Sequence, residues 1–430
     1  MTNRLRIGVA GLGTVGAGVV RLLQEHPDLL ARRAGQPLAI TAVSARDRSR
    51  DRGVDLSDMA WFDDPAELAA NGDVDVVVEL IGGSDGIAKR VCEKAIANGK
   101  QVVTANKALI AIHGTALARA AEEAGVSIGF EAAVAGGIPI VKALREGLAG
   151  NAISRVYGIL NGTCNYILTQ MRETGRDFED VLGEAQTLGY AEADPSFDVD
   201  GVDAAHKLAI LASVAFGCPV DFDAVHVEGV RHVSATDIAY ADELGYRIKL
   251  LAIARTTEHG LEQRVHPCMV SLDNPIAHVD GVFNAVVAEG DFVDRTVFEG
   301  RGAGAGPTAS AVVADIVDCA AGRRVPTFGA PAAELASIPV SPMARHQGRY
   351  YIRLMVHDRP GVIADVSAVL RDEKISIGSM LQRGRSKQDA VPVILITHEA
   401  EEAGMARAMQ RIAGLEPVMR EPRMIRIEEF

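Results

Sequence analysis

The chain has 430 residues, of which 48% are hydrophobic, so it is long enough for two or three domains with sizeable cores. Its net charge of -13 comes without a long basic tract, which argues against nucleic acid and anionic membranes as partners. Five cysteines without CxxC spacing argue against a disulfide framework or a zinc site. With neither a signal peptide nor an apolar run of roughly 18 residues, we expect a soluble cytoplasmic protein.

The first predicted elements are a strand, a glycine turn and a helix. The strand covers residues 5–10, and a second strand at residues 38–44 follows at the spacing of a dinucleotide-binding fold. Gly11 can make the tight turn, Gly13 lets the backbone approach a pyrophosphate, and Gly16 brings the helix close to the strand. We therefore predict cofactor contacts from Gly11, Gly13, Thr14, Val15 and Gly16.

The end of the second strand bears on the type of cofactor. A site for NAD usually offers an acidic residue to the ribose 2′-hydroxyl, whereas here Arg46 precedes Asp47. An arginine at this place can hold the 2′-phosphate of NADP, while Asp47 keeps NAD open and a solvated charged loop explains both residues. We favour NADP, with Arg46 as its contact.

Two further strands, at residues 74–80 and 101–107, flank a helix at 84–98 and continue the βα rhythm of a parallel sheet. Ligands gather beyond the carboxyl ends of such strands. Lys107 can therefore face cofactor and substrate, although a surface lysine before a helix is the alternative.

Residues 130–139 are predicted to close this sheet. Their small side chains leave backbone carbonyls accessible, and Glu131 adds a carboxylate. Such oxygen ligands suit a hard cation, although a plain strand-to-turn connection explains the same residues.

An apolar helix predicted after Gly201 carries Asp203 and Lys207 four residues apart, and therefore on one face. A solvated salt bridge, worth about 0.2–0.5 kcal/mol, is one interpretation. The neighbouring positions are almost all apolar, however, and burying an ammonium group is costly unless carboxylates or a ligand accompany it. We favour a cleft in which Lys207 lies beside Glu192, Asp198 and Asp203.

Beyond a glycine-rich turn at residues 300–306 and a helix at 310–320, prolines at 331, 339 and 342 mark a linker. A small βαββαβ module is predicted after it. Its elements are a strand at 350–356, a turn at 358–361, a helix at 362–372, strands at 375–382 and 391–397, a helix through about residue 412, and a strand near 417–427.

Taken together, these motifs resemble those of homoserine dehydrogenases. The segments GLGTVG, TANK at 104–107, EAAVAGGIPI at 131–140, ILNGTCNYIL at 159–168 and LGYAEADPSFDVDGVDAAHKLAIL occur in the family's order over nearly the whole chain. DRPGV at 358–362 resembles the ACT domain, and without a preceding aspartate kinase domain the chain resembles the monofunctional type. The resemblance implies NAD(P)-dependent hydride transfer between L-homoserine and L-aspartate 4-semialdehyde, in threonine, methionine and isoleucine biosynthesis.

The resemblance also implies an α/β fold in three parts. A Rossmann-type dinucleotide-binding domain covers residues 1–135 and is completed by about 300–330. A mixed α+β domain at 136–300 binds substrate, carries the catalytic residues and makes a homodimer or homotetramer. After a linker at 331–348, an ACT regulatory domain covers 349–430.

By the same resemblance, Lys207 is the proton donor to the aldehyde oxygen, and Lys107 contacts the cofactor and the reacting centre. Glu192 and Asp203 hold the amino-acid substrate. Asp198, with Asp194, either completes the cage around Lys207 or caps a helix.

The resemblance places further contacts outside this cage. Gly189 and Gly304 touch the cofactor, and a monovalent cation, Na⁺ or K⁺, binds at Glu131, Val134, Gly136 and Ile138. Asp358 and Gly361 bind threonine as a feedback effector, with a passive dimerisation module as the alternative.

Two rival functions stay open on the sequence alone. A non-catalytic sensor of redox state or threonine needs no costly lysine among carboxylates, so Lys207 weighs against it. An aldehyde dehydrogenase acting through a cysteine thioester needs an activated thiol, and Cys164 has no histidine near it in the sequence.

Overall fold

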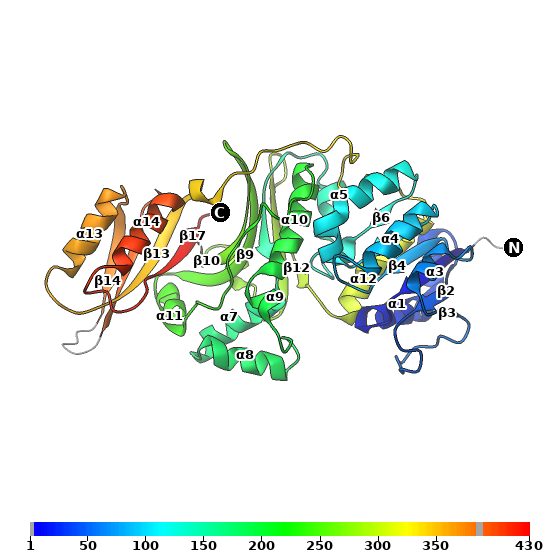
Figure 1. The fold of residues 1–430 in the computed structure, drawn as a ribbon, viewed down its shortest axis with the longest axis horizontal. Helices are drawn as coiled ribbons and strands as arrows, with labels where there is room; N and C mark the ends of the chain where they lie inside the picture. Colours follow the sequence, from blue (N-terminus) through cyan, green and yellow to red (C-terminus); the bar gives the residue numbers. More distant parts are fainter. Residues whose placement is uncertain (1–3, 384–389) are drawn as a thin grey trace.

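The computed structural model describes residues 4–383 and 390–430, and within these ranges the strands form a six-stranded and an eleven-stranded sheet. Figure 1 shows an elongated molecule, with the smaller sheet and the N-terminus at one end and the C-terminal module at the other. No helix of the described part is long and apolar enough to cross a membrane.

The smaller sheet is parallel throughout and has the strand order β3-β2-β1-β4-β5-β6, which is that of a Rossmann-type fold. Its strands are β1 (Leu5–Ala10), β2 (Leu38–Ser44), β3 (Ala60–Phe62), β4 (Val76–Glu79), β5 (Gln101–Thr104) and β6 (Ile128–Gly129). The predicted fold class is confirmed here, and β1 and β2 coincide with the predicted ranges because apolar runs bounded by turn residues define a buried strand.

Helices accompany this sheet: α1 (Thr14–Glu25), α2 (Pro27–Ala34), α3 (Pro65–Ala70), α4 (Ile87–Ala97), α5 (Lys107–Glu123) and α12 (Ala305–Ala320). α12 returns from far along the sequence to pack against α1 (Figure 1). A Cβ atom at Gly18 would lie 3.0 Å from the carbonyl oxygen of Ala305, so the glycine permits this close approach.

Several segments differ from the sequence prediction. The glycine-rich turn predicted at 300–306 is shorter, because β12 ends at Arg301 and α12 already begins at Ala305, and the last strand begins at Arg423 rather than near residue 417. Two further differences lie near the nucleotide-binding sheet. Residues 130–139 do not extend the sheet: β6 ends at Gly129, and a 3₁₀ turn (Glu131–Ala133) follows, then positive φ angles at Ala135 (53°) and Gly136 (46°) that a strand does not adopt. The strand predicted at 101–107 ends at Thr104, because the side chain of Asn106 accepts a hydrogen bond from the backbone N–H of Leu109 and caps α5.

The larger sheet runs in the order β12-β11-β7-β9-β10-β17-β13-β15-β14, with β8 beside β10 and β16 beside β13. Its strands are β7 (Ile153–Ile159), β8 (His226–Val227), β9 (Tyr246–Thr257), β10 (Gly260–Ser271), β11 (Phe283–Gly290), β12 (Asp294–Arg301), β13 (Gln347–Val356), β14 (Ile377–Gln382), β15 (Val391–Thr397), β16 (Ala400–Glu401) and β17 (Arg423–Glu428). The helices of this part are α6 (Ile140–Lys142), α7 (Gly162–Thr174), α8 (Phe178–Thr187), α9 (Ser196–Val199), α10 (Val202–Phe216), α11 (Ala235–Glu243), α13 (Val362–Asp372) and α14 (Glu402–Ala413).

The C-terminal module has the predicted βαββαβ order, formed by β13, α13, β14, β15, α14 and β17, with the short β16 before α14. It also continues the larger sheet, because β17 pairs in parallel with β10. The connection at 331–348 lies against the same strand, where Leu261 donates a hydrogen bond to the carbonyl of Pro339. The module is therefore joined to the rest of the chain by backbone hydrogen bonds.

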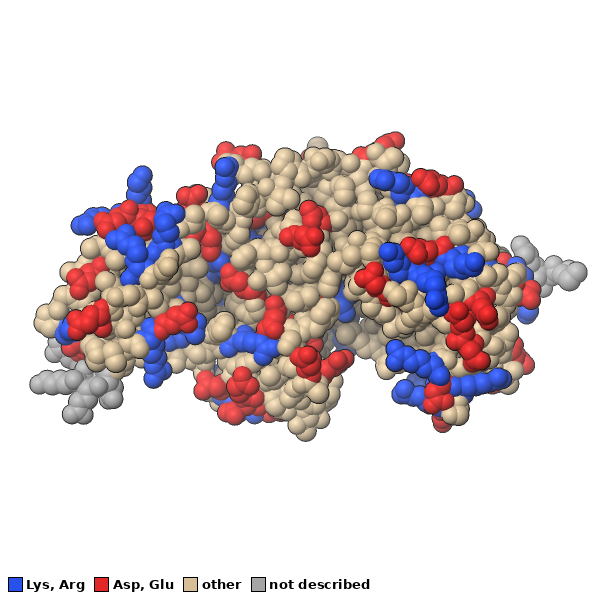
Figure 2. Space-filling view, viewed as in Figure 1, with Lys and Arg blue, Asp and Glu red and all other residues tan. Residues whose placement is uncertain are grey.

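Acidic and basic side chains are interspersed over the face drawn in Figure 2. On that face the basic residues do not form one continuous patch, in keeping with a sequence that has a net charge of -13 and no long basic tract.

Candidate active site

A buried carboxylate joins two lysines between the two sheets. Lys207 Nζ lies 2.8 Å from Asp203 Oδ2, and Lys107 Nζ lies 3.1 Å from Asp203 Oδ1. Lys207 also donates a hydrogen bond to the carbonyl of Leu160 at 2.7 Å. Lys107 comes from the first turn of α5, whereas Asp203 and Lys207 come from α10, so folding brings together residues from separate layers.

The electrostatics of this cluster depend on burial. Asp203 is only 4% exposed, and burial by itself raises the pKa of its carboxyl group. The ammonium groups of Lys207 and Lys107 outweigh burial and hold the pKa of Asp203 well below its usual range. The pKa of neighbouring Asp198 is raised, by burial and by the charge of Asp203. Asp203 is therefore the charged partner of both lysines.

Asn161 connects the acidic residues and was not singled out from the sequence. Its amide Nδ2 donates hydrogen bonds to Asp198 Oδ1 and Asp203 Oδ2, both at 2.8 Å. Its carbonyl Oδ1 accepts from the backbone N–H of Cys164 and caps α7. The sequence offered an asparagine in the motif ILNGTCNYIL, but no helix was predicted after it, so neither the cap of α7 nor the bridge between the two carboxylates could be inferred.

The other acidic candidates lie outside the cluster. Glu192 is exposed on the loop before α9, and its carboxylate makes no hydrogen bond or ion pair with the described residues. Asp194 accepts a hydrogen bond from the backbone N–H of Ser196, at the start of α9. Gly189 has φ 76° and follows the end of α8, so its conformation also serves the helix terminus.

A cavity of about 610 Å³ lies at the carboxyl ends of β1 and β2, where a dinucleotide binds in this fold. A Cβ atom at Gly11 would lie 2.5 Å from the carbonyl oxygen of Leu80, and one at Gly16 would lie 2.0 Å from that of Gly11. At Gly13 no atom of the described residues would lie within 4 Å of a Cβ, so this backbone faces open space. Thr14 and Val15 begin α1 beside it, and the segment fits a pyrophosphate.

Basic side chains line the same cavity: Arg46, Arg50, Arg52 and Arg90. Asp47, the acidic residue that would allow NAD as the cofactor, accepts hydrogen bonds from the backbone N–H and the hydroxyl of Ser49, at 2.8 and 2.6 Å. These bonds lower the pKa of Asp47 and occupy its Oδ1. The rim also carries Asp63 and Asp64, of which Asp64 caps α3.

The predicted cation ligands lie on an irregular loop. Glu131 is 2% exposed and accepts hydrogen bonds from the backbone N–H groups of Val141 and Lys142. Burial, followed by the charge of Asp315, raises its pKa to about 7. Among the hydrogen bonds of the described residues, none reaches the carbonyls of Val134 and Gly136. These oxygens and a desolvated carboxylate suit a cation.

The same loop meets the glycine-rich turn before α12. A Cβ atom at Gly136 would lie 2.5 Å from the carbonyl oxygen of Gly302, and Gly137 donates a hydrogen bond to the carbonyl of Arg301. Gly304, the predicted cofactor contact, has φ 114° and directly precedes α12 as its N-cap residue. Unlike the carbonyls of Val134 and Gly136, the carbonyl of Ile138 accepts a hydrogen bond, from the backbone N–H of Ile140.

Comparison with known proteins bears directly on this arrangement. Residues 139–317 match the family model described as homoserine dehydrogenase, residues 11–131 match that of the homoserine dehydrogenase NAD-binding domain, and residues 350–417 match the ACT domain. A homoserine dehydrogenase from Pseudomonas aeruginosa is 48% identical, with 99% of both chains covered. The chain belongs to the homoserine dehydrogenase family.

Other homoserine dehydrogenases agree with this membership. The relative from Neisseria gonorrhoeae is 46% identical, with 99% of each chain covered. The crystal structure of a homoserine dehydrogenase from Thiobacillus denitrificans superposes with a TM-score of 0.94 at 44% identity, again over 99% of both chains. A hyperthermophilic archaeal homoserine dehydrogenase in complex with NADPH covers 74% of this chain, with a TM-score of 0.62 at 29% identity and 97% of its own length covered.

The regulatory candidates of this homoserine dehydrogenase family member lie in the turn between β13 and α13. Gly361 is exposed, has φ 98° and directly precedes α13 as its N-cap residue. Asp358 accepts a hydrogen bond from the side chain of Gln382 at 3.5 Å, and Arg359 pairs with Glu416. The structure therefore brings both candidates to the end of β13.

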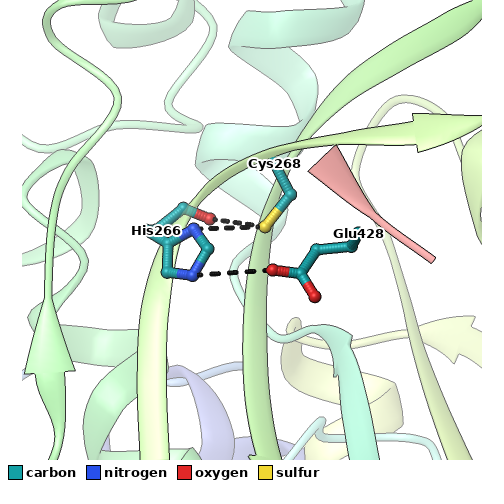
Figure 3. A group of neighbouring side chains, drawn as sticks. All are labelled: His266, Cys268 and Glu428. Carbon is teal, nitrogen blue, oxygen red and sulfur yellow. Dashed lines mark hydrogen bonds and ion pairs between the residues drawn. The ribbon is translucent and has the colours of Figure 1, made fainter. Parts of the chain in front are cut away.

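A second cluster of potential ligands is buried between β10 and β17. Figure 3 shows His266 and Cys268 on β10 and Glu428 on β17. Fully buried Arg264 donates hydrogen bonds to both carboxylate oxygens of Glu428, at 2.6 and 3.0 Å, and lies 2.9 Å from His266 Nε2. The guanidinium group of Arg264 therefore occupies both oxygens of Glu428 and lies against His266, and its positive charge would repel a metal ion. Arg264 and Glu428 form an ionic joint between β10 and β17 rather than a metal site.

Proposed function

We propose that this chain is a homoserine dehydrogenase that interconverts L-homoserine and L-aspartate 4-semialdehyde by NAD(P)-dependent hydride transfer, as part of threonine, methionine and isoleucine biosynthesis. The proposal rests on one observation above all, the carboxylate of Asp203 shared by Lys107 and Lys207. A non-catalytic sensor has no use for two ammonium groups at one buried carboxylate.

In the reductive direction, bound NADPH supplies the hydride to the aldehyde carbon. Lys207 stabilises the negative charge that grows on the aldehyde oxygen and then donates its proton there. Asp203 holds the ammonium groups of Lys207 and Lys107 in place. Lys107, from the nucleotide-binding layer, orients the reacting centre.

Carboxylates hold the α-ammonium group of the substrate in this proposal. Asp203 and Asp198 already lie together through Asn161. Glu192 approaches from its exposed loop, and Gly189 at the start of that loop contacts the cofactor.

We infer that NADP is preferred over NAD. The support is the concentration of arginines around the cavity and the hydrogen bonds that turn Asp47 toward Ser49. Gly11, Gly13, Thr14, Val15, Gly16, Arg46 and Gly304 are the proposed contacts. The structure of the archaeal homoserine dehydrogenase holds NADPH, which agrees with this choice.

A monovalent cation, Na⁺ or K⁺, is proposed at the carbonyls of Val134, Gly136 and Ile138 and the carboxylate of Glu131. The raised pKa of Glu131 supports it, as do the carbonyls of Val134 and Gly136, which accept no hydrogen bond from the part of the chain that the structure describes. The hydrogen bond from Ile140 to the carbonyl of Ile138 makes that ligand the weakest of the four.

Threonine is proposed as a feedback effector, bound at Asp358 and Gly361 of the ACT domain. We further propose a homodimer, or a homotetramer, because β12 is an edge strand of the larger sheet and Phe292, in the turn before it, is 87% exposed. The domains are taken as residues 1–135 with about 300–330, 136–300, and 349–430 after the linker 331–348.

The test follows NADPH absorbance with L-aspartate 4-semialdehyde for the wild type, for Lys207→Met, and for Lys94→Met as a matched control. Lys94 is exposed on α4, away from the cluster. We expect wild-type turnover, a loss of about 10²-fold or more for Lys207→Met with NADPH binding retained, and no change for the control. A folded wild type that binds NADPH but does not turn over contradicts the proposal.

Regulation is tested in the same assay by titrating threonine. We expect inhibition of the wild type, and a higher half-inhibitory concentration for Gly361→Val, because a side chain at this φ strains the turn. Full activity at saturating threonine would favour a passive dimerisation module.

A further inference from the structure

A stack of three aromatic rings stands beside the lysine pair. The rings of Phe197 and His206 are 5.5 Å apart at 29°, and those of His206 and Phe222 are 4.2 Å apart at 15°. The ammonium group of Lys107 lies 5.5 Å from the centroid of Phe197, at the open end of the stack. The stack thus connects the short helix α9, the second turn of α10 and the segment after α10 to the lysine on α5.

The central ring is a neutral spacer. His206 is 7% exposed, and its Nδ1 has no hydrogen-bond partner among the described residues. Burial, followed by the charge of Lys107, lowers the pKa of His206. A neutral ring can lie near the ammonium group of Lys107, whereas an imidazolium would repel it.

Lys107 has few contacts that fix its direction. Among the described residues its ammonium group has one ion pair, with Asp203 Oδ1, and one ring contact, with Phe197. A lysine side chain is long and flexible, so a single carboxylate oxygen leaves it free to pivot. An aromatic face supplies a second attachment for a cation.

Phe197 is itself 42% exposed, which is more than core packing requires. Its neighbour Asp198 is tied to Asn161, so α9 is held from both sides, by the stack and by the carboxylate. A partly exposed aromatic ring beside the ammonium group of Lys107 serves the site better than it serves the core.

We propose that Phe197, supported by His206 and Phe222, is a positioning residue that orients the ammonium group of Lys107 toward the reacting centre. This inference rests on the role given to Lys107 in the proposed function. It assigns no proton transfer to His206, because the ring acts only through its face.

A double-mutant cycle tests whether Phe197 acts through Lys107. We expect Phe197→Leu to lower kcat about tenfold, with the dissociation constant of NADPH unchanged and a larger isotope effect from NADPH deuterated at the transferred hydrogen. In the Lys107→Met background the same substitution should cause no further loss. Phe197→Tyr should keep kcat near the wild-type value, because it retains an aromatic ring. Phe216→Leu, the same substitution at the C-terminal end of α10, is the control and should leave kcat within about twofold of wild type.

The second arm separates the ring from its nitrogens. His206→Phe should retain activity because it keeps a stacking ring, whereas His206→Ala should behave like Phe197→Leu. Losses that add up in the double variant, or an inactive but folded His206→Phe, overturn the proposal. If the wild type turns over and Phe197→Leu matches it, only this inference fails, whereas a wild type without turnover contradicts the proposed function itself.

Discussion

The carboxylate of Asp203 accepts a hydrogen bond at 2.8 Å from Lys207, four residues further along the same helix. On a solvated helix this pair would contribute only about 0.2–0.5 kcal/mol. Here Asp203 is buried and also pairs with Lys107. Removing one partner of a buried ion pair leaves an uncompensated charge, which strongly lowers the free energy of unfolding.

We expect Asp203→Asn to abolish turnover and to lower the free energy of unfolding by about 3 kcal/mol, because two ammonium groups lose their compensating charge. Urea denaturation measures the stability, and NADPH oxidation the activity. Asp200→Asn is the control, since Asp200 is a partly exposed carboxylate three residues earlier that pairs with Arg231, and its effect should stay near 0.5 kcal/mol. Equal stability of the two variants would contradict the buried pair.

Arg46 should decide the choice of cofactor. Arg46→Ala is expected to raise the KM for NADPH about tenfold and to leave that for NADH nearly unchanged, because only NADPH carries the 2′-phosphate. Arg48→Ala is the matched control, since Arg48 lies 5.8 Å over Trp61 and does not line the cavity. An equal rise in the KM values for NADPH and NADH would contradict this role, because it would place Arg46 at a part that both cofactors share, such as the pyrophosphate.

Glu131 should make stability depend on pH. Its pKa rises from 4.5 to about 7 on folding, so between these values the folded chain binds more protons than the unfolded chain. In buffer without Na⁺ or K⁺, the free energy of unfolding should therefore fall as pH rises through this window, by about 3 kcal/mol in total, and Glu131→Gln should remove this slope.

If Na⁺ or K⁺ binds there, its affinity should increase as pH passes about 7, because the cation prefers the carboxylate form of Glu131. Isothermal titration at several pH values measures this dependence. Glu131→Gln should lose it, and a wild type whose stability ignores both pH and cation would contradict the site.

All five cysteines are buried, and burial raises the pKa of each thiol, to about 11 for Cys218 and about 12 for Cys319. We expect a thiol reagent to label none of them rapidly in the folded chain and all of them in denaturant, with activity retained after exposure of the native enzyme. Rapid labelling of Cys164 with loss of turnover would revive the thioester mechanism.

The ionic joint between β10 and β17 should hold the ACT domain in place. Glu428→Gln leaves the fully buried guanidinium of Arg264 with reduced compensation, and we expect a loss of about 3 kcal/mol in the free energy of unfolding. Glu421→Gln, an exposed neighbour in the same module, should change it by less than about 0.5 kcal/mol. Similar values for both would show that the joint contributes little.

Local patterns predicted many elements of the nucleotide-binding part and of the C-terminal module, whereas most elements between about residues 140 and 300 were not assigned from the sequence. β1, β2, β15 and α13 lie where the sequence predicts them, because apolar periodicity and turn residues act within a few positions. The same locality explains the misses. Nothing within the segment 130–139 reveals that Glu131 turns toward the N–H groups of Val141 and Lys142 rather than continuing a strand.

The candidate site, too, has one part that the sequence determines and another that only the tertiary structure decides. The sequence alone determined that Asp203 and Lys207 share a helix face, since four residues make about one turn of any α-helix. The tertiary structure decided that Lys107 joins them, that Asn161 bridges the carboxylates, and that Glu192 stays on an exposed loop. It also decided that β17, the last strand of the C-terminal module, pairs with β10 in the preceding part of the chain. These relationships depend on how distant segments come together, and packing is a property of surfaces assembled from such segments rather than of any one window of the chain.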